Sequence, residues 1–181
     1  MRIFGAPLKV TPLIGVVAAA TATACGAASQ AIKNDTAGGL KLVACNSVIA
    51  ATAKPTPGRR IVLGRLVLPR EGHVLQGRAD QRNRPLPFFA KQGLEVLASR
   101  VRVDVIVPEE WRRRAAVSWG ENGGPGQVSH VRFLGCAPVA GRRWLSYPGG
   151  YFLREPACLP LVVRIGRSVA RVRLSIGRRC G

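Results

Sequence analysis

Cys25 is the residue of this chain whose position most clearly points to a chemical reaction. It follows a basic start, an apolar run from Val10 to Ala20 and the small residues Ala22-Thr23-Ala24. This order is typical of a bacterial export signal, and a cysteine directly after the cleavage point can accept lipid. We therefore expect a signal peptide over residues 1–24 and a lipid anchor on Cys25. Cleavage without lipid is the alternative, since Ala22 stands where a larger aliphatic residue is usual.

The other four cysteines are expected to form disulfides. An exported chain meets an oxidising environment, and an even number remains once Cys25 is assigned to lipid. Four cysteines allow three pairings, which the sequence does not distinguish. Their spacing favours Cys136–Cys158, which flank a Gly- and Pro-rich stretch, together with Cys45–Cys180; a free Cys45 is the alternative. With two histidines and no C-x-x-C motif, the chain offers no obvious zinc site.

Ser118 is the one candidate nucleophile with a suggestive context. It lies in Ala116-Val117-Ser118-Trp119-Gly120, one residue away from a nucleophile-elbow motif. Such an elbow needs a strand, a turn and a helix, followed later in the chain by an acid and then a histidine. Here a glycine-rich loop follows, and His130 comes only twelve positions later. A small serine hydrolase that uses Ser118 and His130 is therefore an alternative and not the leading hypothesis.

Arginines and aromatic residues occur together in two places. One group surrounds Trp111 and the other precedes Trp144. Aromatic rings beside arginines can stack on sugars or lie at a lipid head-group boundary. The alternative is that the aromatic residues belong to the core and the arginines form a solvated rim. The predicted binding patch consists of Trp111, Arg112, Arg113, Arg114, Arg142, Arg143, Trp144 and Tyr147.

The charge balance of the chain is strongly basic. It has 28 Lys and Arg residues against 9 Asp and Glu, a net charge of +19, and only five of the basic residues are lysines. Arginine codons are frequent in GC-rich genomes, which accounts for part of this bias. Net charge supports attraction to polyanions without specifying the partner. With an export signal the partners are anionic lipids or acidic cell-wall polymers, whereas inside a cell they would be nucleic acids.

Residues 25–58 are predicted to be a tether between the membrane and a folded domain. This stretch is rich in Ala, Gly and Thr and ends in Lys54-Pro55-Thr56-Pro57-Gly58. Two apolar pieces within it, Leu40–Cys45 and Val48–Ala51, could form a strand or a short helix docked on the body. The apolar run near the start is shorter than the roughly 20 residues of a membrane-spanning helix.

From Arg59 onward the sequence predicts an all-β domain. Val101–Val107 alternates apolar and polar residues, which is the period of a half-buried strand. Leu159–Ile165 and Val169–Ile176 are joined by Gly166-Arg167-Ser168 and predict a hairpin. Short strands every 8–12 residues, separated by turn signals, favour a sandwich. We expect residues 59–181 to form a small Ig-like or related antiparallel β-sandwich with disulfides.

The C-terminal half contains a characteristic set of cysteines, glycines and aromatic residues. Over about residues 59–181 the chain resembles a family of small secreted proteins and lipoproteins of high-GC Gram-positive bacteria for which no activity is known. The resemblance implies an exported β-domain and transfers no catalytic residue or cofactor. It rests on Trp119-Gly120, Gly135-Cys136, Trp144, Tyr147, Gly149-Gly150, Cys158-x-Pro160-Leu161-x-Val163, Gly166 and Gly177-x-x-Cys180.

These observations favour one function over two others. We expect an exported, membrane-anchored, non-catalytic envelope protein that binds anionic surface polymers or another envelope protein and needs no cofactor. The alternatives are the small secreted serine hydrolase and an arginine-rich nucleic-acid-binding protein of the cell interior, for which the export signal would have to be misread.

Overall fold

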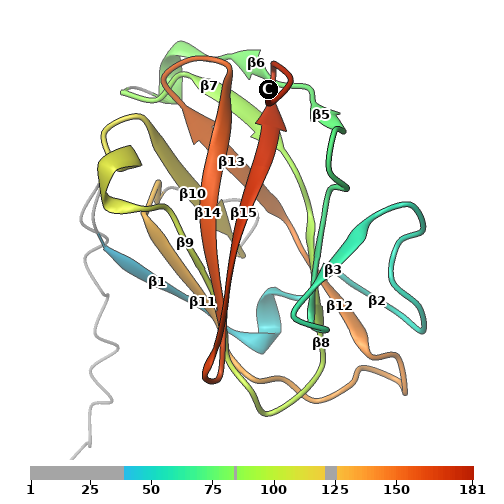
Figure 1. Cartoon of the computed structure of the whole chain (residues 1–181). Coiled ribbons are helices and arrows are strands. Elements are labelled where there is room, and N and C mark those ends of the chain that lie inside the picture. The colour runs from blue at the N-terminus through green and yellow to red at the C-terminus, as the bar shows by residue number, and fades with distance from the viewer. Residues whose placement is uncertain (1–38, 84, 121–125) are drawn as a thin grey trace, which may run out of the picture. The chain divides into compact units, whose positions relative to one another are not determined.

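The computed structural model describes residues 39–83, 85–120 and 126–181 (Figure 1). The expected signal peptide, Cys25 and the first part of the expected tether lie outside these residues. Within the described part the regular structure is β-strand with three short 3-10 helices. No helix there is long and apolar enough to cross a membrane.

The strands form three sheets that together build a sandwich. The four- and five-stranded sheets continue into one another. Only two residues separate β7 (Phe88–Lys91) from β8 (Leu94–Leu97), and one residue separates β12 (Trp144–Tyr147) from β13 (Gly149–Leu153). All strand pairs are antiparallel except two, which lie at the two edges of the six-stranded sheet. The predicted all-β antiparallel sandwich is therefore confirmed.

The bounds of the elements, in the order in which the strands pair, are as follows. The six-stranded sheet contains β1 (Leu40–Val43), β11 (His130–Phe133), β9 (Val103–Ile106), β14 (Ala157–Ile165), β15 (Ser168–Ile176) and β5 (Val74–Leu75). The four-stranded sheet contains β10 (Ala115–Trp119), β13 (Gly149–Leu153), β7 (Phe88–Lys91) and β6 (Arg78–Ala79). The five-stranded sheet contains β2 (Ala50–Thr52), β12 (Trp144–Tyr147), β8 (Leu94–Leu97), β4 (Leu66–Leu68) and β3 (Arg60–Val62). The 3-10 helices are η1 (Cys45–Ser47), η2 (Gln81–Asn83) and η3 (Glu109–Trp111).

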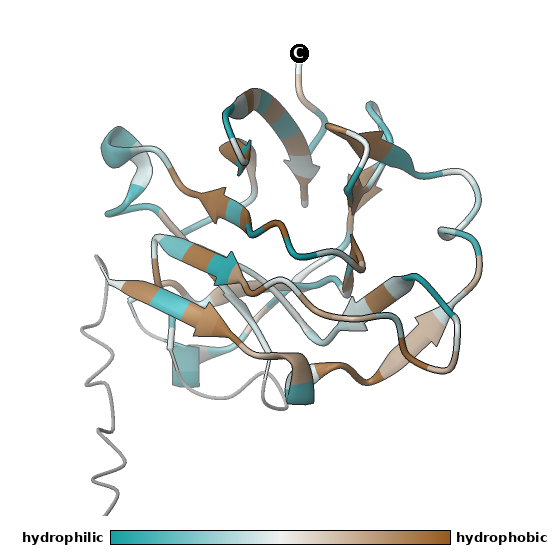
Figure 2. Ribbon diagram, turned by 90° about the horizontal axis from the view of Figure 1, so that it is seen from below, coloured by the Kyte–Doolittle hydropathy of each residue, from teal (hydrophilic) through white to brown (hydrophobic). Residues whose placement is uncertain are grey.

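The core lies between the layers and is filled by alternate residues of the strands. Along β14 the odd-numbered positions are buried and the even-numbered ones are not, because successive side chains of a strand point to opposite faces. Figure 2 shows brown and teal bands along β1 as well, but there the burial is reversed, since Leu40 and Leu42 are exposed and Lys41 is partly buried. Four large rings meet at the centre and pack at centroid distances of 4.9–6.2 Å: Trp119, Phe133, Tyr147 and Tyr151.

The predicted C-terminal hairpin is confirmed as β14 and β15. Ile165 pairs with Ser168, which leaves a two-residue turn, and Gly166 has the positive φ of 59° that such turns require. Arg171 and Arg173 are exposed as the alternation predicts, but Ser175 is buried. Its hydroxyl accepts a hydrogen bond from the Cys180 amide (3.0 Å), because the C-terminal segment folds back over it.

Residues 39–58 belong to the folded body, which corrects the predicted tether for this part of the range 25–58. β1 pairs with β11 at one edge of the six-stranded sheet, and β2 pairs with β12 at one edge of the five-stranded sheet. Farther along, Thr56 donates its amide (2.9 Å) and its hydroxyl to the buried Glu95 carboxylate. Of the strand and the short helix that the sequence allowed here, Leu40–Val43 forms the strand. The helix η1 then connects it to β2 at the edge of the other sheet.

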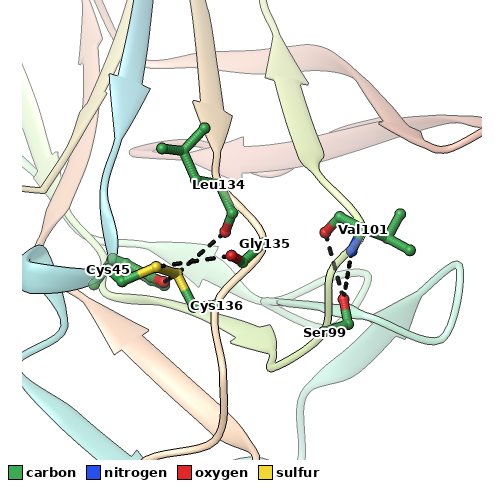
Figure 3. The surroundings of a disulfide bond; sticks show 7 residues. Cys45, Ser99, Val101, Leu134, Gly135 and Cys136 are labelled. Carbon is green, nitrogen blue, oxygen red and sulfur yellow. Dashed lines mark hydrogen bonds between the residues drawn. A yellow bond between two sulfur atoms is a disulfide. The ribbon is translucent and has the colours of Figure 1, made fainter.

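The disulfides join Cys45 to Cys136 and Cys158 to Cys180, with Cα–Cα distances of 5.6 and 5.0 Å. The predicted pairs Cys136–Cys158 and Cys45–Cys180 are therefore wrong, and Cys45 is not free. Cys45 in η1 and Cys136 after β11 both lie in segments that pass from the six-stranded to the five-stranded sheet, and Figure 3 shows the bond that joins them. The pairing therefore follows from which cysteines the strand order brings close together in space, and not from how close they are in sequence.

Candidate functional site

The first half of the predicted binding patch lies at η3. Trp111 packs against the core, and the Arg114 guanidinium stands 4.7 Å above its ring. Arg114 also donates to the Glu155 carboxylate at 3.4 Å. Arg112 and Arg113 line a separate pocket, described below. This half of the patch is therefore at the surface, but its arginines point to different places: Arg114 contacts Trp111 and Glu155, whereas Arg112 and Arg113 line the pocket.

The second half of the predicted patch is mostly core. Trp144 is 8% exposed and Tyr147 is 1% exposed, so neither can offer its ring to a surface ligand. Burial also raises the pKa of the Tyr147 hydroxyl to about 12. Arg142 and Arg143 are exposed in the turn before β12, which lies far from η3 in Figure 1. The interpretation of core aromatic residues with rim arginines is correct for this half, and the eight residues do not form one patch.

Ser118 and His130 do not form a nucleophile and base. Ser118 is 1% exposed in β10, and its hydroxyl accepts a hydrogen bond from the Lys41 ammonium at 3.3 Å. His130 in β11 is bonded instead to Asp104, with 2.7 Å between Nε2 and Oδ1. Among the described residues no hydrogen bond joins the serine to the histidine. The nucleophile–base contact that a serine hydrolase needs is therefore not made, and the serine is closed to substrate.

His130 takes part in an ion cluster between strands. Asp104 on β9 lies opposite Arg132 on β11, and Arg132 Nε donates to the Asp104 carboxylate at 2.6 Å. Burial raises the pKa of Asp104, but the hydrogen bonds from Arg132 and His130 together outweigh it, so the pKa is lowered. The carboxylate therefore stays ionised and ties β9 to β11, which is a structural role.

A basic cleft opens between the loop that follows β4, the start of β5 and the end of β15. Its volume is about 760 Å³. Its basic residues come from distant parts of the chain: Arg70 and His73 from the loop between β4 and β5, Arg173 from β15 and Arg179 from the C-terminal segment. One carboxylate side chain, Glu71, accompanies them. The lining consists of Arg70, Glu71, Gly72, His73, Val74, Arg173, Ser175, Arg179, Cys180 and Gly181, and we call this site the basic cleft.

Local structure on both sides of the basic cleft holds its arginines in place. The His73 amide donates to the Arg70 carbonyl (3.1 Å), which closes the turn that leads into β5. On the other side, Gly177 has a φ of 66° and turns the chain back, and the Cys158–Cys180 disulfide secures the returning segment. This places Arg179 in the wall of the cleft.

The basic cleft is rich in cations that have no acidic partner. Among the described residues Arg70, Arg173 and Arg179 form no ion pair, whereas Arg82, Arg114 and Arg132 do. A smaller pocket of about 210 Å³ shares Arg70 and His73 with the cleft and adds Arg59. Guanidinium groups bind carboxylates and phosphates through two parallel hydrogen bonds. The arrangement can therefore hold several anionic groups of one extended ligand.

Sequence reasoning missed the basic cleft. The segment Arg70-Glu71-Gly72-His73 has the composition of an ordinary loop, and Arg173 has that of the solvated face of a strand. The only sequence signal was the excess of arginine, and composition does not predict which arginines lie close together in the folded domain. Only the parallel pairing of β5 with β15 brings residues about a hundred positions apart into one wall.

No metal site is formed in the described ranges, where no group of three or more His, Cys, Asp and Glu side chains could hold an ion.

The chain matches no known protein-family model and no curated protein.

Proposed function

We propose that this chain is an exported, membrane-anchored, non-catalytic envelope protein that binds anionic surface polymers through the basic cleft. Cys25 would accept the lipid anchor, and the domain would lie outside the cytoplasmic membrane. Two acyl chains suffice for stable anchoring, since each buried CH₂ contributes about 0.8 kcal/mol.

The disulfides and the charge support this proposal. Structural disulfides persist in oxidising compartments and are rare in the cytosol, so the two bonds are compatible with export. The chain from Cys25 onward keeps a net charge of +17, since Arg2 and Lys9 are the only charged residues that cleavage removes, and this charge attracts polyanions at long range. It is a general attraction, however, and a defined site is needed to make it selective.

The observation that supports polymer binding most directly is the convergence of arginines without acidic partners in the basic cleft. Arg70, Arg173 and Arg179 line one cavity, and Arg59 extends it into the adjoining pocket. Since exposed charges are screened by salt, binding through this cleft should weaken strongly as ionic strength rises. A polymer that carries one negative charge per repeat could contact several of these guanidinium groups at once.

Neutralising the basic cleft should weaken binding to a polyanion and reduce its dependence on salt. We expect Arg70→Gln/Arg173→Gln/Arg179→Gln to bind long-chain polyphosphate less tightly than the unaltered protein. On nucleic acids each phosphate contact contributes about 1 to the slope of log affinity against log salt, so the slope should fall by about 2 to 3. Calorimetric titrations between about 0.05 and 0.5 M salt measure this slope.

The matched control removes the same charge elsewhere. Arg142→Gln/Arg143→Gln/Arg167→Gln takes three exposed arginines from two turns outside the basic cleft. This variant should keep most of the affinity and most of the slope. Equal losses in both variants, or binding that is unchanged at about 0.5 M salt, would show that the cleft is not the binding site.

The anchor has its own test, the intact mass of the protein purified from the membrane fraction of the producing cells. We expect a chain that begins at Cys25 with added acyl mass, and a gain of two hydrogens per disulfide on reduction. Cys25→Ser should then appear in the soluble fraction. A chain with residues 1–24 still attached and all thiols reduced would contradict export altogether.

A further inference from the structure

A second apolar cluster lies on the outer face of the four-stranded sheet. Ala116, Phe152 and Phe89 stand side by side on β10, β13 and β7, because they pair in register across these strands. The two phenylalanine rings are 4.7 Å apart. Leu86, from the loop before β7, covers the cluster and is buried. Apolar residues therefore occupy a sheet face that in most two-layer sandwiches is polar.

A pocket of about 850 Å³ opens beside this cluster. Its apolar lining residues are Pro85, which is exposed, and Leu86 and Ala116, which are 3% and 2% exposed and only close its base. The accessible apolar surface of this floor is therefore Pro85 together with the aliphatic stems of the lining arginines. Its rim is basic, with Arg112 and Arg113 following η3 and Arg154 following β13. Glu109 and Gln127 complete the lining, and we call this site the arginine-rimmed pocket. Its volume falls in the range that small-molecule sites occupy.

The rim of the arginine-rimmed pocket has more positive than negative charge. Three guanidinium groups face one carboxylate, Glu109, and among the described residues none of the three forms an ion pair. Arg112 is only partly exposed, and its Nε is buried with no hydrogen-bond partner in the described part of the chain. Because this Nε is closed off from solvent, the terminal nitrogens of Arg112 are the donors that a ligand in the pocket would meet.

We infer that the arginine-rimmed pocket binds a small amphipathic carboxylate, an anion with an acyl or aryl body. The body would cover Pro85 and the aliphatic stems of the arginines, where each Å² of apolar surface removed from water contributes about 25 cal/mol. The carboxylate would accept charge-assisted hydrogen bonds from the rim arginines. A polar surface polymer offers nothing to the apolar floor, so this ligand differs in chemistry from that of the basic cleft.

Octanoate is the probe for this inference, with acetate and 1-octanol as matched controls. Titration calorimetry of the purified protein at pH 7 should show octanoate binding, measurable at concentrations up to about 10 mM. Acetate lacks the apolar body and 1-octanol lacks the charge, so each should bind about tenfold more weakly or not at all. Absence of octanoate binding over this range, or equal binding of octanoate and 1-octanol, would overturn the inference.

Charge reversal locates the site. Arg113→Glu/Arg154→Glu changes two exposed rim residues, and the fold is checked by circular dichroism. We expect octanoate binding to weaken by about tenfold or more, since a repulsive rim replaces an attractive one. Arg167→Glu/Arg171→Glu makes the same change of charge on the hairpin and should bind octanoate normally. An equal loss in both double variants would show a general charge effect and overturn the site.

The two proposals fail independently. Arg70→Gln/Arg173→Gln/Arg179→Gln should weaken polyphosphate binding while leaving octanoate binding unchanged. Arg113→Glu/Arg154→Glu should do the reverse, apart from the general effect of charge that the hairpin variant measures. Loss of octanoate binding in the basic-cleft variant would place the amphipathic ligand in the wrong site and contradict this inference.

Discussion

Removing the Cys45–Cys136 disulfide is expected to lower the free energy of unfolding by about 4.6 kcal/mol. The bond closes a loop between residues 91 positions apart, and closure of a loop of that size removes this much chain entropy from the unfolded state. The Cys158–Cys180 bond spans 22 positions, and its loss should cost about 3.4 kcal/mol. Domains of this size have a total stability of about 5–15 kcal/mol, so either loss is a large fraction of the whole.

Guanidinium chloride unfolding of the paired variants Cys45→Ser/Cys136→Ser and Cys158→Ser/Cys180→Ser measures the difference. Each variant removes both partners, so no single thiol remains from the broken bond. The first variant should have the lower midpoint. A first variant as stable as the second would contradict the prediction, because loop size would then not determine the cost.

The location of the effect gives a second measure. The Cys45–Cys136 bond lies in the segment that joins β1 at one sheet edge to β2 at another. Without the bond, each of these short edge strands is held by one neighbour only. Amide hydrogen exchange in residues 40–52 should therefore accelerate more than exchange in β14 and β15. Uniform acceleration would mean that the segment opens only with the whole domain.

Replacing Trp119 by alanine is expected to cost about 3–5 kcal/mol, the usual range for a buried aromatic residue. The side chain is fully buried and packs edge-on against Tyr151, with 5.2 Å between the ring centroids. Its Nε1 donates a hydrogen bond to the Gln92 carbonyl at 2.8 Å. Alanine therefore leaves both a cavity and an unpaired carbonyl at the junction of β7 and β8.

Trp119→Phe separates the two contributions. It retains most of the ring volume and loses the hydrogen bond, so a smaller cost of about 1–3 kcal/mol is expected. Trp111→Ala is the control, because Trp111 is only partly buried and should cost less than Trp119→Ala. Thermal and denaturant unfolding measure all three variants. A cost for Trp119→Ala no greater than for Trp111→Ala would contradict the central position of this ring.

Much of the strand structure could be predicted from local patterns. The alternation in Val103–Val107 and in the C-terminal hairpin predicted which side chains are buried, because a strand has a period of two whatever its neighbours are. Val101, which precedes β9, is exposed. Ser175 departed from the pattern only because the C-terminal segment covers it. At Leu40–Val43 the sequence does not distinguish a strand from a short helix, because four residues do not show whether a partner edge exists.

The all-β sandwich, the hairpin and the excess of positive charge can be inferred from the chain alone, because they follow from local periodicity, turn residues and composition. Four features follow from the tertiary structure alone: the disulfide pairing, the burial of Trp144 and Tyr147, the lack of a hydrogen bond between Ser118 and His130, and the two arginine-lined cavities. Each of these depends on strand order. The pairing of β1 with β11 and of β5 with β15 brings together residues about a hundred positions apart, and local sequence contains no record of such pairs.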